Sequence, residues 1–234
     1  MEARLAGETD VAGFREEARA LLAHQVPPEA VHWQTEPARN SDLFTDPAAP
    51  GDSRPRGVPK AASAIVPASF LRLCEIVVLH RDPARFALLY RLLWRLVHEP
   101  ALRHSPLDAD MLHAHQMAQA VRRDMHKMKA FLRFRPVDDG RPDPLQLAWF
   151  DPAHHIVEAV APWFARRSPQ TRWAILTPER SVEWDTRQLH FGPGLKRLDA
   201  PLPDSNDAAW LACYQRALGE HRQTAPRAQD KTVP

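Results

Sequence analysis

The chain has 234 residues, of which 44% are hydrophobic, and its 31 basic and 29 acidic side chains give a formal net charge of +2. This length is enough for one sizeable hydrophobic core. The chain contains no apolar run long enough to span a bilayer, and its charged N-terminus lacks the apolar centre of a secretory signal. Cys74 and Cys213 each fall in an apolar, helix-like stretch, which is typical of buried free thiols in a reducing compartment. We therefore expect a cytoplasmic protein with no membrane partner.

The first half of the chain is predicted to be mainly helical. Apolar residues recur at helical spacing over residues 10–25, 67–80, 82–98 and about 108–131. Asp82 and Pro83 supply a helix cap and a first-turn proline. Short strands are expected over residues 27–33 and 63–67, and the Pro-rich segment at about 36–60 is expected to be a loop or disordered.

The second half alternates in a way that is typical of short strands. We expect strands over residues 131–137, 145–150, 172–178, 181–185 and 188–193. One helix over 151–167 separates the second and third strands, another follows at 206–220, and the tail over 221–234 is expected to be disordered. The prediction is one α+β domain over residues 1–220. Its helical N-terminal half packs against a small antiparallel sheet of four to five strands, with helices on one face.

Residues 111–135 form the most basic segment, with six lysine and arginine side chains against one aspartate, a net charge of +5. On an ideal helix Met117, Val121, Met125, Met128 and Leu132 share one apolar stripe. The basic side chains fall elsewhere, and this pattern predicts a nucleic-acid-binding helix that contacts phosphates. Two alternatives stay open: an exposed basic face in an arginine-rich chain, and an acidic protein partner. The candidate contact residues, including two from the next helix that would widen the surface into a groove, are Arg122, Arg123, His126, Lys127, Lys129, Arg133, Arg135, Arg166 and Arg167.

Aromatic residues follow the basic segment in the sequence. They include Phe131, Phe134, Trp163 and Trp173. Aromatic rings beside basic side chains can stack the bases of a single strand. For any one of them a place in the hydrophobic core is the more probable prediction.

A second hypothesis is an enzyme that acts on DNA through a histidine acid–base pair. It requires its candidate residues to converge in one cleft, although Thr177 and Ser181 more plausibly shape a turn. A third hypothesis is a protein-interaction module with an exposed apolar patch near Trp210 and Tyr214. No strict metal-ligand spacing, phosphate-binding loop or CxxC pair occurs, so no metal and no cofactor are predicted. The candidate catalytic residues are His126, His154, His155, Thr177, Ser181 and Asp185.

Three long motifs carry a resemblance to a known family: AVRRDMHKMKAFLRFR, WFDPAHHIVEAVAPWFARR, and WAILTPERSVEWD followed by LHFGPG. Together they make the chain, from about Asp10 to Trp210, resemble a bacterial family of uncharacterised proteins linked to DNA repair. Members stand alone, associated with a radical SAM repair protein, or form the N-terminal part of X-type uracil-DNA glycosylase fusions. The resemblance implies a DNA-repair context and those two partners, but no reaction. The absence of a GEAPG-like loop indicates that this chain is not itself a glycosylase.

Overall fold

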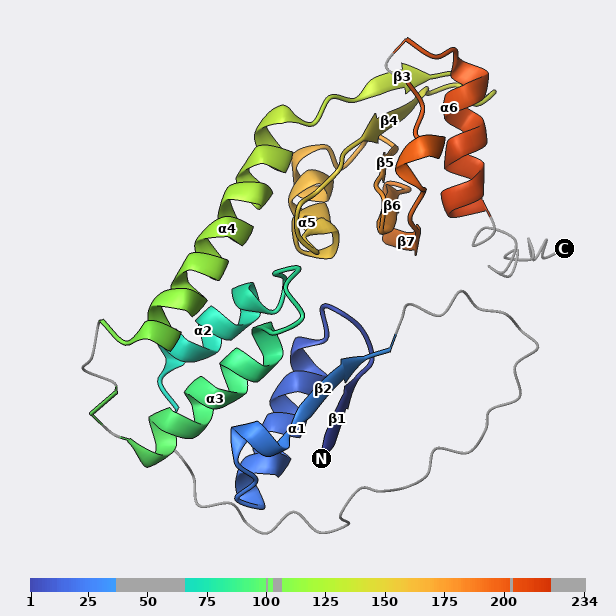
Figure 1. Cartoon of the computed structure of the whole chain (residues 1–234). Helices are drawn as coiled ribbons and strands as arrows, with labels where there is room; N and C mark the ends of the chain where they lie inside the picture. The colour runs from blue at the N-terminus through green and yellow to red at the C-terminus, as the bar shows by residue number, and fades with distance from the viewer. Residues whose placement is uncertain (37–65, 100, 103–106, 203, 220–234) are drawn as a thin grey trace, which may run out of the picture. The chain divides into compact units, whose positions relative to one another are not determined.

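The computed structural model describes residues 1–36, 66–99, 101–102, 107–202 and 204–219. The predicted loop at about 36–60, most of the predicted strand over 63–67 and the predicted disordered tail lie outside these residues. The chain divides into two compact units, Met1–Arg123 and Asp124–Pro234 (Figure 1). That residues 1–220 behave as a single domain stays a prediction.

The first unit is mostly helical, as its apolar periodicity predicts. It contains α1 (Val11–Ala23), α2 (Ala68–Val77), α3 (Arg85–His98) and the first part of α4 (Ala109–Phe131). Each lies within a few residues of its predicted bounds. The Asp10 carboxylate caps α1 by accepting a hydrogen bond from the Gly13 backbone N–H at 2.7 Å.

A two-stranded parallel sheet accompanies these helices. It pairs β1 (Glu2–Leu5) with β2 (His32–Thr35), and a short 3-10 helix (Pro28–Ala30) precedes β2. The second of these strands was predicted from the sequence, and the first was not. In β1 the buried Ala3 and Leu5 alternate with charged side chains over only four residues, too short a pattern to distinguish a strand from a charged chain end.

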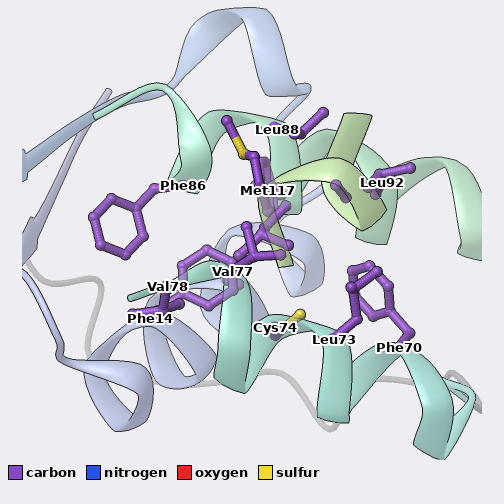
Figure 2. Packing of buried hydrophobic residues seen from close by; sticks show 14 of the residues in the cluster. Phe14, Phe70, Leu73, Cys74, Val77, Val78, Phe86, Leu88, Leu92 and Met117 are labelled. Carbon is purple, nitrogen blue, oxygen red and sulfur yellow. The ribbon is translucent and has the colours of Figure 1, made fainter. Parts of the chain in front are cut away.

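The core of the first unit gathers apolar side chains from α1, α2, α3 and the start of α4. Figure 2 shows Phe14, Phe70, Val77 and Met117 converging there. Cys74 lies among them as a buried free thiol, and burial raises its pKa to about 12. Cys213 in the second unit is also buried and free, so the predicted state of both cysteines is confirmed.

The second unit is built on a five-stranded sheet, and all five strands were predicted. The strands lie in chain order: β3 (Arg135–Val137), β4 (Leu145–Trp149), β5 (Trp173–Leu176), β6 (Arg180–Trp184) and β7 (Leu189–Pro193). Three pairings are antiparallel, and β4 pairs with β5 in parallel. The α+β class and the small, largely antiparallel sheet are confirmed. The parallel pair follows from α5 (Val157–Arg167), the crossover helix that a parallel connection needs.

Helices cover both faces of this sheet rather than the one face predicted (Figure 1). On one face Trp173 of β5 packs against Phe164 of α5, with ring centroids 6.0 Å apart. The adjacent Ala174 points to the other face, into a core shared with α6 (Asp207–Tyr214) and the π-helical turn that continues it (Gln215–Gly219). A side chain at Gly192 would collide with the Ala217 carbonyl oxygen, so only glycine lets this turn lie so close to β7.

Candidate nucleic-acid interface

The orientation of α4 is set by a buried stripe that includes a charged residue. Val121, Met128 and Leu132 are buried, and so is Asp124, which lies three residues after Val121 and four before Met128. The Asp124 carboxylate accepts a hydrogen bond from the His154 backbone N–H at 3.0 Å, which holds the loop that precedes α5. The only carboxylate in the basic segment is therefore used inside the protein.

The basic side chains in the middle of α4 are exposed. The exposed side chains are those of Arg122, Arg123, His126 and Lys127. Within the described parts of the chain no carboxylate forms an ion pair with any of them. Arg123 and Lys127 are one helical turn apart, so like charges are neighbours along one ridge of the helix, and Arg122 adds a third positive charge beside them. This surface of α4 therefore carries several positive charges that no carboxylate among the described residues neutralises.

Two of the predicted contact residues, Arg133 and Arg135, lie beyond the C-terminal end of α4, although the helix ends where it was predicted to end. The helix ends at Phe131, so Arg133 lies just beyond it, and its guanidinium donates a hydrogen bond back to the Ala130 carbonyl at 3.3 Å. Arg135 lies in β3, where it pairs with Asp207 at 2.9 Å and its guanidinium lies 5.4 Å from the centre of the Trp210 ring. Arg135 therefore has a structural role within the second unit.

Helix α5 adds further basic residues next to α4. The Lys129 ammonium lies 5.6 Å from the centre of the Trp163 ring, a cation–π contact that joins the two helices. Arg166 and Arg167 follow Trp163 by three and four residues and are exposed. They share its side of α5 and extend the basic surface beyond Lys129. We call Arg122, Arg123, His126, Lys127, Lys129, Arg133, Arg166 and Arg167 the basic surface.

The histidines of the acid–base hypothesis do not converge. Asp124 faces the loop that carries His154, and His126 lies two residues further on, about 200° around the helix axis. His126 is therefore exposed on the opposite side of α4 from that loop. His154 and His155 precede α5 rather than beginning it, because the helix starts at Val157. His155 Nδ1 lies 2.8 Å from the Glu179 carboxylate in the β5–β6 turn.

The other three catalytic candidates lie before, within and after β6. The Thr177 hydroxyl donates to the Arg180 carbonyl at 2.8 Å and accepts from the Arg180 backbone N–H at 3.2 Å, the turn-shaping geometry that the sequence favoured. Ser181 is completely buried. Asp185 follows the other end of the strand. Five extended residues separate it from Arg180, the first residue of β6, which corresponds to roughly 17 Å. The six candidates thus do not share one cleft.

Asp185 stabilises the β6–β7 hairpin. Its carboxylate accepts hydrogen bonds from the backbone N–H groups of Arg187 and Gln188, both at 2.8 Å, and lies 2.9 Å from His190 Nε2. Burial alone would raise its pKa, but the hydrogen bonds from Gln188, His190 and Arg187 outweigh burial and lower the pKa to about 2. The carboxylate is held ionised as part of the turn.

The surroundings of Trp210, Tyr214 and Arg172 show which of these side chains are available for binding. Trp210 and Tyr214 are buried in the core beneath the sheet, so neither side chain is exposed for protein docking. Arg172, close in sequence to Arg166 and Arg167, forms a two-pronged ion pair with Asp139 at 2.8 and 2.9 Å and is not part of the basic surface. Asp139 carries no sequence signal for this role, because 33 residues separate the partners.

The described residues contain neither a candidate metal cluster nor a candidate membrane-spanning helix. None of their His, Cys, Asp and Glu side chains gather in groups of three or more that could hold a metal ion. No helix in the same part of the chain combines the length and apolar composition needed to cross a bilayer.

Comparison with known proteins identifies the family of this chain. No curated protein and no solved structure is similar to this chain. The model of a domain of unknown function, DUF4130, matches residues 83–234, which include α3, α4 and the whole second unit. The chain belongs to the DUF4130 family.

Proposed function

We propose that this protein binds DNA through the basic surface and acts as an accessory module rather than as the enzyme. The observation that carries the proposal is the middle of α4. There exposed cationic side chains have no carboxylate partner among the described residues, while Asp124 is turned inward. Phosphate groups would neutralise these charges, and the release of their counterions would favour binding.

The main structural alternative is the helix dipole. Cations in the last turn of a helix are stabilised by the partial negative charge there, which accounts for Lys129 in α4 and for Arg166 and Arg167 in α5. This effect falls off within one turn. It does not reach Arg122 and Arg123, which lie about two turns before the end of α4. These two residues therefore distinguish the proposal from the alternative.

The proposed DNA-repair context rests on the resemblance described above. On the same resemblance, the proposed partner is a uracil-DNA glycosylase or a radical SAM repair protein. Binding to DNA through phosphates positions a protein without reading sequence, which suits a module that presents DNA to a separate enzyme.

The test is the salt dependence of DNA binding. Fluorescence anisotropy with a labelled oligonucleotide would compare the wild type with Arg122→Gln/Arg123→Gln at about 50 and about 200 mM salt. Glutamine keeps the helix propensity close to that of arginine. If both side chains contact phosphates of duplex DNA, the negative slope of log affinity against log salt should become shallower by about 1.8 in the double variant.

The matched control is Arg72→Gln/Arg187→Gln, which removes two exposed arginines from α2 and from the β6–β7 hairpin. It lowers the net charge equally, so a general charge effect would weaken both double variants alike. Binding that is absent in the wild type, or equal in the two double variants, would contradict the proposal.

A further inference from the structure

We infer that the preferred ligand of the basic surface is single-stranded nucleic acid, with a base stacked on Phe131. This inference rests on the proposed function and specifies the class of ligand. Phe131 is 65% exposed, and among the described residues it is the only aromatic side chain in the exposed class. The remaining described aromatic rings are buried or half-buried, as predicted, whereas the core position predicted for Phe131 is wrong, because this residue ends α4 instead of entering the sheet.

The position of Phe131 separates it from the other exposed apolar residues. Single exposed apolar side chains are common on protein surfaces and need no function. Phe131, however, continues the ridge of α4 that carries Arg123 and Lys127, at spacings of eight and four residues. Side chains on such a ridge are about 6 Å apart, so two exposed cations lead directly to an exposed ring.

The geometry at the helix end favours a base rather than the backbone at this position. Phe131 is the last residue of α4, and the Arg133 guanidinium is held at the neighbouring Ala130 carbonyl. The ring thus has cationic groups before and after it along the chain. A strand whose phosphates follow Arg123 and Lys127 can turn a base onto the ring, which is the arrangement of stacking platforms that bind single strands.

A duplex would use this ridge differently. Its bases are already stacked on one another, so the ring gains a partner only by unstacking a base step. Phosphate contacts from Arg123 and Lys127 are available to both forms. Removing the ring should therefore weaken binding to a single strand selectively.

The experiment measures the Kd of Phe131 variants for one labelled oligonucleotide of mixed sequence, alone and annealed to its complement. Phe131→Ala should raise the Kd for the single strand about 5- to 150-fold and leave the duplex Kd unchanged. Phe131→Trp should retain binding, whereas Phe131→Leu, which keeps apolar area but no aromatic face, should behave like alanine. Leu112→Ala, at a 41% exposed position earlier on α4, is the control and should bind normally.

Each other outcome is informative. If Phe131→Ala binds the single strand as tightly as the wild type while Arg122→Gln/Arg123→Gln is weakened, the stacking inference is wrong and the proposed function stands. An equal loss on the duplex would assign the ring to wedging between base pairs and overturn the single-strand preference. Retention by leucine would point to an apolar partner instead of a base. A wild type that binds neither DNA form would overturn the proposed function as well.

Discussion

Replacement of Asp124 tests whether this carboxylate serves the fold or compensates the basic surface. It is buried and accepts the His154 backbone N–H at 3.0 Å. A hydrogen bond to a charged group contributes about 1.5 to 3 kcal/mol, and since this bond is only partly buried, water can replace some of it in a variant. We expect Asp124→Ala to lower the free energy of unfolding by about 1.5 to 2 kcal/mol.

Asp124→Asn separates the charge from the hydrogen bond. The amide oxygen can still accept from His154, but a neutral bond is roughly half as strong, so the expected loss is about 1 kcal/mol. For a unit of this size, about 4 °C in Tm corresponds to each kcal/mol. Thermal unfolding followed by near-UV circular dichroism should therefore rank the proteins as wild type, asparagine, alanine, with steps of about 4 °C or less.

The two roles of Asp124 predict opposite results for DNA binding. If the carboxylate serves only the loop before α5, the folded Asp124→Asn protein should bind DNA with an affinity close to that of the wild type. If instead it neutralises neighbouring cations, asparagine should tighten DNA binding and leave Tm unchanged. The second pattern would refute our interpretation of α4.

Two ion pairs give further predictions. Asp139→Asn removes the carboxylate that pairs with the largely buried Arg172 guanidinium. The free energy of unfolding, measured in urea at neutral pH, should therefore fall by about 3 kcal/mol. Arg172 lowers the pKa of Asp139 below its ordinary 3.8, so the pair stabilises the protein fully above that pH. As the pH falls further, the difference in free energy of unfolding between wild type and variant should shrink. A difference that stays constant would contradict this prediction. Arg85→Met should lower the free energy of unfolding by about 1.5 to 3 kcal/mol, since this completely buried guanidinium donates to the Val78 carbonyl at 2.7 Å and pairs at 2.6 Å with Glu8, which water can solvate in the variant; an unchanged urea midpoint would show that these bonds contribute nothing net.

The sequence pattern was sufficient to predict most secondary structure and a largely antiparallel sheet, but not the parallel pairing of β4 with β5. The five strands of the larger sheet were found because each alternates or is continuously apolar between turn residues. The parallel β4–β5 pair and the helices on both faces depend on how the crossover helix returns to the sheet. Several strand orders share the same sequence pattern, so local periodicity does not determine this.

The start of α5 shows why local capping signals can mislead. Asp151 followed by Pro152 is a common helix start, yet the helix begins at Val157. The intervening residues are held by partners far away in sequence: Asp151 pairs with Arg197, and His154 donates to Asp124. Such long-range contacts outweigh the local preference of a few residues, and one sequence does not reveal them.

The inward direction of Asp124, by contrast, was readable. It falls three residues after Val121 and four before Met128, on the stripe that the periodicity assigned to the core. Counting charges along the segment treats this residue as a partner for its basic neighbours. Projecting the same residues onto a helix places it among buried methionines, where its carboxylate needs an internal hydrogen-bond donor.

Arginine-rich composition alone does not account for the basic surface, because composition fixes how many arginines there are and not which ones lack a carboxylate. In this chain arginines with a structural role are paired, as Arg95 is with Asp108 and Arg172 with Asp139. Unpaired arginines such as Arg72 occur singly elsewhere in the described chain, at little cost. Between residues 122 and 127 three exposed cations share less than two turns of helix, and each like-charge neighbour costs a few tenths of a kcal/mol. A polyanionic ligand converts that repulsion into binding energy, whereas a purely structural helix gains nothing from it.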